Sequence, residues 1–293
     1  MSATTLRPRF FGTFRGEVIK VSRQLSFWLM SVAGLVVIGV ITLAVTSSQG
    51  IQDQLTTNPT AWAYGARDVF GTVFQVGSGI FLLIVGSRLI GMEYSSGTIR
   101  ILYARGTGRL HLLLAKMLTL AVIGVIALAA YLLVVGAVIG LLINSWTGSL
   151  DPVQHISSSF WEDLGRWALV QGMSMGIAIL LAAAAAGIGR GLAFAMAASM
   201  AFFPADNFSV VLEMLAARAT RHDHPWLDIS QYQLGPNLNT VLNLMEPGHH
   251  ARAAFATPLT PVDLTHALVV ISAFAVGFAA IAVVRAVRPD VLE

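Results

Sequence analysis

Residues 91–111 read GMEYSSGTIRILYARGTGRLH, a polar, arginine-bearing segment between two long apolar runs. Residues 93–102 can form about two helical turns, and Gly106 closes them, because glycine readily ends a helix. Such a helix would lie across a membrane surface and be joined to the apolar segment on either side. A partner that gripped it would move both segments together.

The composition is that of a membrane protein. The chain has 293 residues, of which 56% are hydrophobic and 11% are charged, whereas soluble domains carry about 25% charged residues. It has no cysteine, which excludes disulfides, thiolate metal sites and cysteine nucleophiles. The net charge of +3 is too small to indicate a nucleic-acid partner, and none is expected.

Uncharged runs predict six membrane-spanning helices, since a span needs about 20 mostly apolar residues. One run, residues 191–205, is short: at 1.5 Å per residue it reaches about 22 Å of a core roughly 30 Å thick. We therefore expect this fifth span to continue past Pro204 as a kinked or broken helix. The other five runs are residues 24–52, 69–87, 117–150, 167–189 and 264–284.

The fold class expected is an all-α integral membrane protein with a single transmembrane domain over residues 1–293. Residues 7–25 have the pattern of an amphipathic helix in the inner interface, although a basic tail that only sets topology is the alternative. Residues 206–263 are expected to form an extracytoplasmic loop with short helices. Most of the 18 Lys and Arg residues face inward if the N-terminus is cytoplasmic, which makes both termini cytoplasmic.

Few residues in the sequence indicate a catalytic or metal-binding function. No phosphate-binding P-loop occurs, and we expect no catalytic residue and no metal site in this chain. The outer histidines could supply metal ligands, but their spacing matches no specific motif, and a solvated polar loop is the alternative. The polar residues near the outer end of the fifth span could be functional or could simply lie at the interface. The histidines are His222, His224, His249 and His250.

The polar segment carries the pattern E-[YF]-x-x-G-T-x-R-x-L-x-x-x-G-x-x-R-x-x-x-L-x-x-K, which closely resembles the permease subunits of type-2 ABC transporters. The resemblance extends to the layout of six spans, with the polar segment between spans two and three. The residues that match the pattern are Glu93, Tyr94, Gly97, Thr98, Arg100, Leu102, Gly106, Arg109, Leu113 and Lys116.

The resemblance implies that residues 94–105 form a cytoplasmic coupling helix, seated in a cleft of a separate ABC ATPase subunit. ATP and Mg²⁺ would be bound by that subunit, so this chain would hold no cofactor and would not be an enzyme by itself. The residues expected to contact the ATPase are Glu93, Tyr94, Ser95, Ser96, Gly97, Thr98, Ile99, Arg100, Tyr103 and Arg105.

The resemblance also implies a second permease chain, identical or related, with a substrate path between the two. The lipid bilayer of a cell membrane, a bacterial inner membrane, is the expected location. The candidate path residues are Phe74, Gly77, Phe81, Asp206, Asn207 and Glu213.

The function expected is ATP-driven export of a lipid, peptide, antibiotic or other hydrophobic compound. Two alternatives stay open: an ATP-independent transporter or scaffold, and a metal-handling membrane assembly component that uses the outer histidines.

Overall fold

The structure is a computed structural model that describes residues 10–46, 49–98, 101–102, 106–246, 248 and 255–288. Among these residues it is helical and contains no strand. Six of the described helices are long and apolar enough to cross a membrane, which confirms the predicted all-α membrane fold. They are α2 (Leu25–Thr46), α4 (Pro59–Ser95), α6 (Arg109–Thr147), α8 (Ser158–Gly189), α9 (Leu192–Thr220) and α12 (Leu264–Val287).

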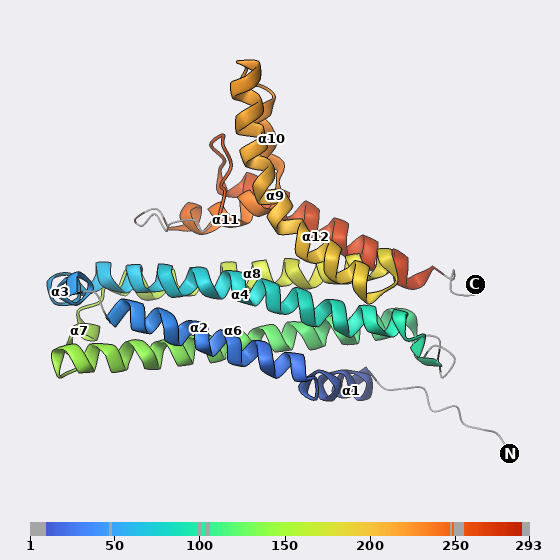
Figure 1. Cartoon of the computed structure of the whole chain (residues 1–293), viewed down its shortest axis with the longest axis horizontal. Helices are drawn as coiled ribbons and strands as arrows, with labels where there is room; N and C mark the ends of the chain where they lie inside the picture. Colours follow the sequence, from blue (N-terminus) through green and yellow to red (C-terminus); the bar gives the residue numbers. More distant parts are fainter. Residues whose placement is uncertain are drawn as a thin grey trace.

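Short helices lie at both ends of the bundle (Figure 1). At one end lies α1 (Phe10–Ser22), beside the connection between α4 and α6; at the other lie α3 (Gln49–Thr57) and α7 (Asp151–Gln154). The chain between α9 and α12 forms α10 (Trp226–Ile229), η1 (Ser230–Tyr232) and α11 (Leu234–Met245), which confirms the predicted short helices between spans five and six. The separate helix α3 was not expected. The uncharged first apolar run continues into its first residues, and Asp53 is the first charged residue, so no charge marks a boundary between the two helices.

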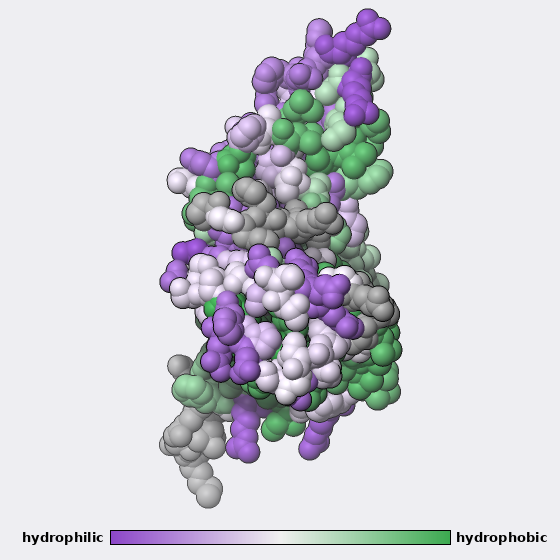
Figure 2. Space-filling model, turned by 90° about the vertical axis from the view of Figure 1, so that its left-hand side faces the viewer, coloured by the Kyte–Doolittle hydropathy of each residue, from purple (hydrophilic) through white to green (hydrophobic). Residues whose placement is uncertain are grey.

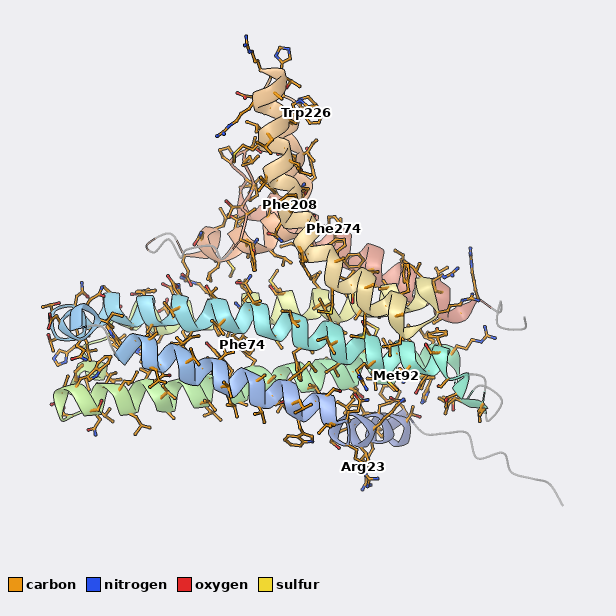
Figure 3. The ribbon with its side chains drawn as sticks, viewed as in Figure 1. Arg23, Phe74, Met92, Phe208, Trp226 and Phe274 are labelled. Atoms are coloured by element: carbon orange, nitrogen blue, oxygen red, sulfur yellow. The ribbon has the colours of Figure 1, made fainter. Side chains whose placement is uncertain are left out.

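The fifth span is a bent helix. Pro204 lies inside α9, where a proline removes one backbone hydrogen bond and clashes with the preceding turn. Figure 1 shows α9 changing direction along its length, and Phe208, labelled in Figure 3, lies on the limb that leads away from the bundle. The expected helix past Pro204 is therefore kinked and not broken, and it runs on to Thr220 inside the region predicted as a loop.

Helices α4 and α8 form the centre of the bundle. Both carry many buried residues along the stretch that crosses the membrane, whereas α2 buries few. Three aromatic rings join α4, α6 and α8: the centroid of Phe74 lies 4.3 Å from that of Tyr131 and 6.0 Å from that of Trp167. These rings fix the three helices against one another over a large apolar area.

Small residues let α4 and α8 approach closely. Residues 182–186 are five alanines, all buried, and the first of them, Ala182, faces Gly86 of α4. A Cβ added at Gly86 would lie 2.9 Å from Cβ of Ala182 and 3.3 Å from Cδ1 of Leu120. Small side chains at such a crossing allow the backbones to pack directly, as is common in membrane bundles.

The substitution Gly86→Ala is expected to destabilise the protein by about 1–3 kcal/mol, because the new methyl group meets another Cβ that cannot rotate away. The control is Gly77→Ala on the same helix, where a Cβ meets nothing within 4 Å. That change should be neutral or stabilise by up to about 1 kcal/mol, since alanine favours the helix. Unfolding of both variants in mixed detergent micelles measures the difference; equal stability would contradict the close approach.

The surface of the bundle separates apolar flanks from polar ends. Large apolar side chains are exposed along α2, α6 and α12, among them Leu35, Leu133 and Val276. Figure 2 looks onto the end that carries α3 and α7, where hydrophilic and weakly polar residues gather, with hydrophobic residues along one flank. This division fits helices whose sides face lipid and whose ends face water.

Candidate functional site

The connection between α4 and α6 is the first candidate site, and glycines shape it. Gly97 and Gly106 have φ angles of +67° and +83°, in the left-handed region that glycine adopts at little cost. Gly108 then forms the N-cap of α6. Between these turns Thr98, Ile101 and Leu102 are helical, while residues 99–100 and 103–105 lie outside the described residues.

The predicted ATPase-contact residues divide into inward and outward groups. Glu93 is buried at 4% exposure, and Tyr94 packs on the apolar cluster that includes Ile90 and Ala186. Ser96 and Thr98 are exposed, and their hydroxyl oxygens lie 2.7 Å apart. Contact with another chain therefore stays a prediction, and among the described predicted contacts Ser95, Ser96 and Thr98 are the exposed ones. The predicted contacts Ile99, Arg100, Tyr103 and Arg105 fall outside the described residues.

Four charged side chains join this connection to α1. We name Glu17, Lys20, Glu93 and Lys116 the inner charge cluster. The Lys116 Nζ atom lies 2.9 Å from Glu17 Oε2 and 2.9 Å from Glu93 Oε1, and Lys20 Nζ lies 2.6 Å from the same Glu93 oxygen. Lys116 also donates to the backbone oxygen of Leu89 at 2.9 Å, so its ammonium group contacts two carboxylates and one carbonyl oxygen.

The inner charge cluster is neutral overall and largely buried. Glu17, Glu93 and Lys116 are 7%, 4% and 2% exposed. Burying charges is tolerated when each one is paired, as here, although Glu93 Oε2 accepts no hydrogen bond from the described residues. Glu17 and Lys20 are three residues apart, which places them on the same face of α1. The cluster thus fixes α1 to the ends of α4 and α6.

Further hydrogen bonds tie other spans to the same end of the bundle. The hydroxyl of Ser95 accepts from the backbone N–H of Leu192, at the start of α9, at 2.9 Å. Arg109 donates to the backbone oxygens of Val287 and Arg288, at the end of α12, at 3.1 and 2.8 Å. The residues on both sides of the α4–α6 connection are therefore bonded to the fifth and sixth spans as well.

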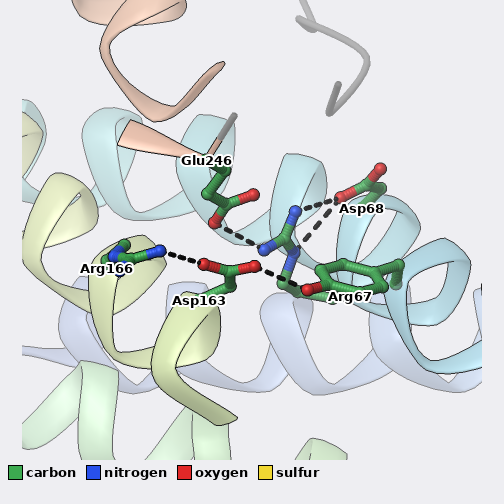
Figure 4. Close-up of polar contacts among 6 residues, drawn as sticks. Arg67, Asp68, Asp163, Arg166 and Glu246 are labelled. Carbon is green, nitrogen blue, oxygen red and sulfur yellow. Dashed lines mark hydrogen bonds and ion pairs between the residues drawn. The ribbon is translucent and has the colours of Figure 1, made fainter. Parts of the chain in front are cut away.

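A second set of buried charges lies near the opposite end of the bundle (Figure 4). Arg67 on α4 donates to Glu246 Oε1 at 2.7 Å, and the side chains are 3% and 0% exposed. Beside them, Tyr64 donates to Asp163 at 2.5 Å and Arg166 pairs with Asp163 at 2.6 Å. Because Glu246 directly follows α11, the Arg67–Glu246 pair fixes the end of that helix to α4.

The six predicted path residues do not meet on one surface. Phe74 is buried against Tyr131 and Trp167, and Phe81 packs on Phe27 of α2. Gly77 is exposed. Asp206 accepts from the backbone N–H of Gly235, Glu213 from the amide of Gln233, and Asn207 from Asn239. Their role in a path therefore stays a prediction, and only Asn207 lines the cavity between α4, α8, α9 and α11.

The outer histidines show one specific contact. His224 is hydrogen-bonded to Asp228, and this bond raises the pKa of the exposed His224 imidazole. Its contribution to stability is complete below the ordinary histidine pKa and is lost as the pH rises through the raised pKa. Within the described residues no group of three or more His, Cys, Asp or Glu side chains could hold a metal ion. His249 and His250 lie outside the described residues.

Sequence reasoning missed the partners in both sets of charges. Charge counting assigns Lys20, Lys116 and Arg67 only to an expected side of the membrane and relates none of them to a carboxylate. Glu17 offered a signal, because an acidic residue on the apolar face of an amphipathic helix needs a buried cation. Glu246 offered none, since nothing in the sequence relates it to Arg67, 179 positions earlier.

Comparison with known proteins identifies the family. A family model described as "ABC-2 family transporter protein" matches residues 13–206, about two thirds of the chain. The match covers most of α1, the α4–α6 connection and all four residues of the inner charge cluster. No curated protein matches the chain. With six helices able to span a bilayer, the chain is a multi-pass membrane protein and belongs to the ABC-2 family of transporter permeases.

Proposed function

We propose that this chain is the permease subunit of an ATP-driven exporter, powered by separate ABC ATPase subunits that bind ATP and Mg²⁺. The ABC-2 family implies such partners, and no P-loop occurs in the sequence. The substrate would be a lipid, peptide, antibiotic or other hydrophobic compound. A second permease chain would complete the assembly in a bacterial inner membrane, with both termini in the cytoplasm.

The observation that carries this proposal is the way the α4–α6 connection is built into the bundle. It joins the two longest described helices, of 37 and 39 residues. Its flanks are bonded to α1 by the inner charge cluster, to α9 through Ser95 and to α12 through Arg109. A displacement of the connection by an ATPase would therefore move several spans as one body, which is what coupling requires.

The test replaces residues 97–100 with four residues of a Gly-Ser linker. Co-purification of the ATPase should be lost, while the bundle stays folded, because Glu93, Arg109 and Lys116 are unchanged. The control is the same replacement at residues 148–151, which form the turn between α6 and α7 and the first residue of α7, at the opposite end of the bundle. That variant should keep the ATPase. ATPase binding that persists in the first variant would refute the coupling role.

A further inference from the structure

A cavity of about 320 Å³ lies inside this single chain, between α4, α8, α9 and α11. It sits near the middle of α4, away from both sets of buried charges, and Pro204 at the bend of α9 lines it. Most of its wall is apolar, with Ile80, Phe203 and Leu238 among the lining residues. Its volume falls at the lower end of the range of about 300–1,000 Å³ for pockets that bind small molecules.

The polar part of the wall is uncharged. It consists of Gln75, Ser174, Asn207 and Asn239, and none of the described lining residues carries a charge. The two asparagines bond each other, because Asn239 Nδ2 donates to Asn207 Oδ1 at 2.9 Å and to the Ala256 backbone oxygen at 2.8 Å. They form a fixed amide surface on one side of the cavity.

Two polar groups in this wall are not satisfied by the described part of the chain. The Ser174 hydroxyl is buried and has no hydrogen-bond partner there. Gln75 makes one long hydrogen bond, from Nε2 to Asn239 Oδ1 at 3.4 Å, and its carbonyl oxygen accepts none among the described residues. Unpaired polar groups in apolar surroundings are costly, and lipid offers them no partner at this depth. A ligand with a hydrogen-bonding group would satisfy both.

We propose that this cavity binds the transported compound, and that the compound is a neutral amphipathic small molecule. Its apolar body would contact Ile80, Phe203 and Leu238, and one amide or hydroxyl group would bond to Ser174 and Gln75. An ionised group would find no opposite charge in the described wall, so charged compounds are excluded. The proposal rests on the proposed transport function and adds the substrate class and a site within one chain.

The experiment uses photolabelling of the full chain in lipid nanodiscs, without ATP. The probe is 4-benzoylbenzamide, which is neutral and has one amide group; its matched probes are the carboxylate 4-benzoylbenzoate and unsubstituted benzophenone. After irradiation, mass spectrometry locates the labelled peptides. The amide probe should label residues 75–83, 174–178, 200–207 or 235–239, and should do so more strongly than either matched probe.

Variants test whether the label depends on the cavity. Gly79 lines the cavity and has open space at its Cβ position, so Gly79→Leu should fill it and abolish the label. The control is Gly136→Leu, at an exposed position on α6 with equally open space, which should leave the label unchanged. Ser174→Ala should lower labelling by the amide probe about fivefold, the effect of losing one hydrogen bond.

The result that overturns the proposal is a label that lies elsewhere, that persists in Gly79→Leu, or that is as strong with the carboxylate probe. If Gly79→Leu does not give a monodisperse protein, Ser174→Ala decides, and equal labelling by the amide probe overturns the proposal. The linker variant at residues 97–100 tests the coupling role separately. ATPase coupling without a label at the cavity would refute only this site; a label without an ATPase partner would refute only the coupling.

Discussion

Replacing Lys116 with methionine is expected to lower the free energy of unfolding by about 3–5 kcal/mol, because it leaves two buried carboxylates without the cation between them. Methionine keeps most of the length and the apolar stem of lysine, so packing changes little. Glu17 would lose its partner at 2.9 Å, and Glu93 would keep only Lys20. Reversible unfolding in mixed detergent micelles measures the change.

The control for this prediction is Lys20→Met, the same substitution in the same cluster. The Lys20 side chain is 38% exposed, so water already solvates its charge and its pair should contribute less than about 1 kcal/mol. The double variant Lys116→Met, Glu17→Gln should recover part of the loss, since one of the unpaired carboxylates is then removed. Similar losses for the two single lysine variants would show that the inner charge cluster is not buried as described.

The second large effect is expected for Arg67→Met, again about 3–5 kcal/mol, because Glu246 is fully buried and would lose the guanidinium at 2.7 Å. The end of α11 should then separate from α4. Limited proteolysis between α11 and α12 measures the separation of α11 from α4. Unfolding in mixed micelles measures the loss of stability independently. The expected result is faster cleavage as well as lower stability.

Arg166→Met provides the matched control, since Arg166 also pairs with a carboxylate in this region but is 41% exposed. Its loss should cost less than about 1 kcal/mol and leave the cleavage rate unchanged. If Arg166→Met accelerates cleavage as much as Arg67→Met, then the buried Arg67–Glu246 pair is not what holds α11 in place.

The spans could be predicted because lipid imposes a simple rule on sequence: about 20 residues without charge. That rule found all six, including the short fifth run, where Pro204 directs the chain into a bend instead of an end. It also underestimated the lengths of all but the first. The run 69–87 became α4, Pro59–Ser95, because Arg67 and Glu93 continue the helix once Glu246 and Lys116 pair with them.

The arrangement of the candidate sites could not be predicted in the same way. Hydropathy assigns Lys116 to a side of the membrane, but it does not relate it to Glu17, which lies 99 positions earlier. The cavity likewise depends on Gln75, Ser174 and Asn239, which come from three helices and match no motif. Of the residues that line the cavity, only Asn207 was predicted as a path residue, because it interrupts an apolar helix. Contacts between distant residues depend on helix packing, which a single sequence does not encode in any local pattern.

The inner charge cluster also has a consequence for the biosynthesis of the protein. Glu17 is made 99 residues before Lys116 and 76 residues before Glu93. Until the third span is synthesised and inserted, α1 has no buried cation to receive its carboxylate, so it must stay in the hydrated interface. Helix α1 can therefore reach its final position only after the third span is inserted. A chain truncated before Lys116 would leave α1 on the membrane surface.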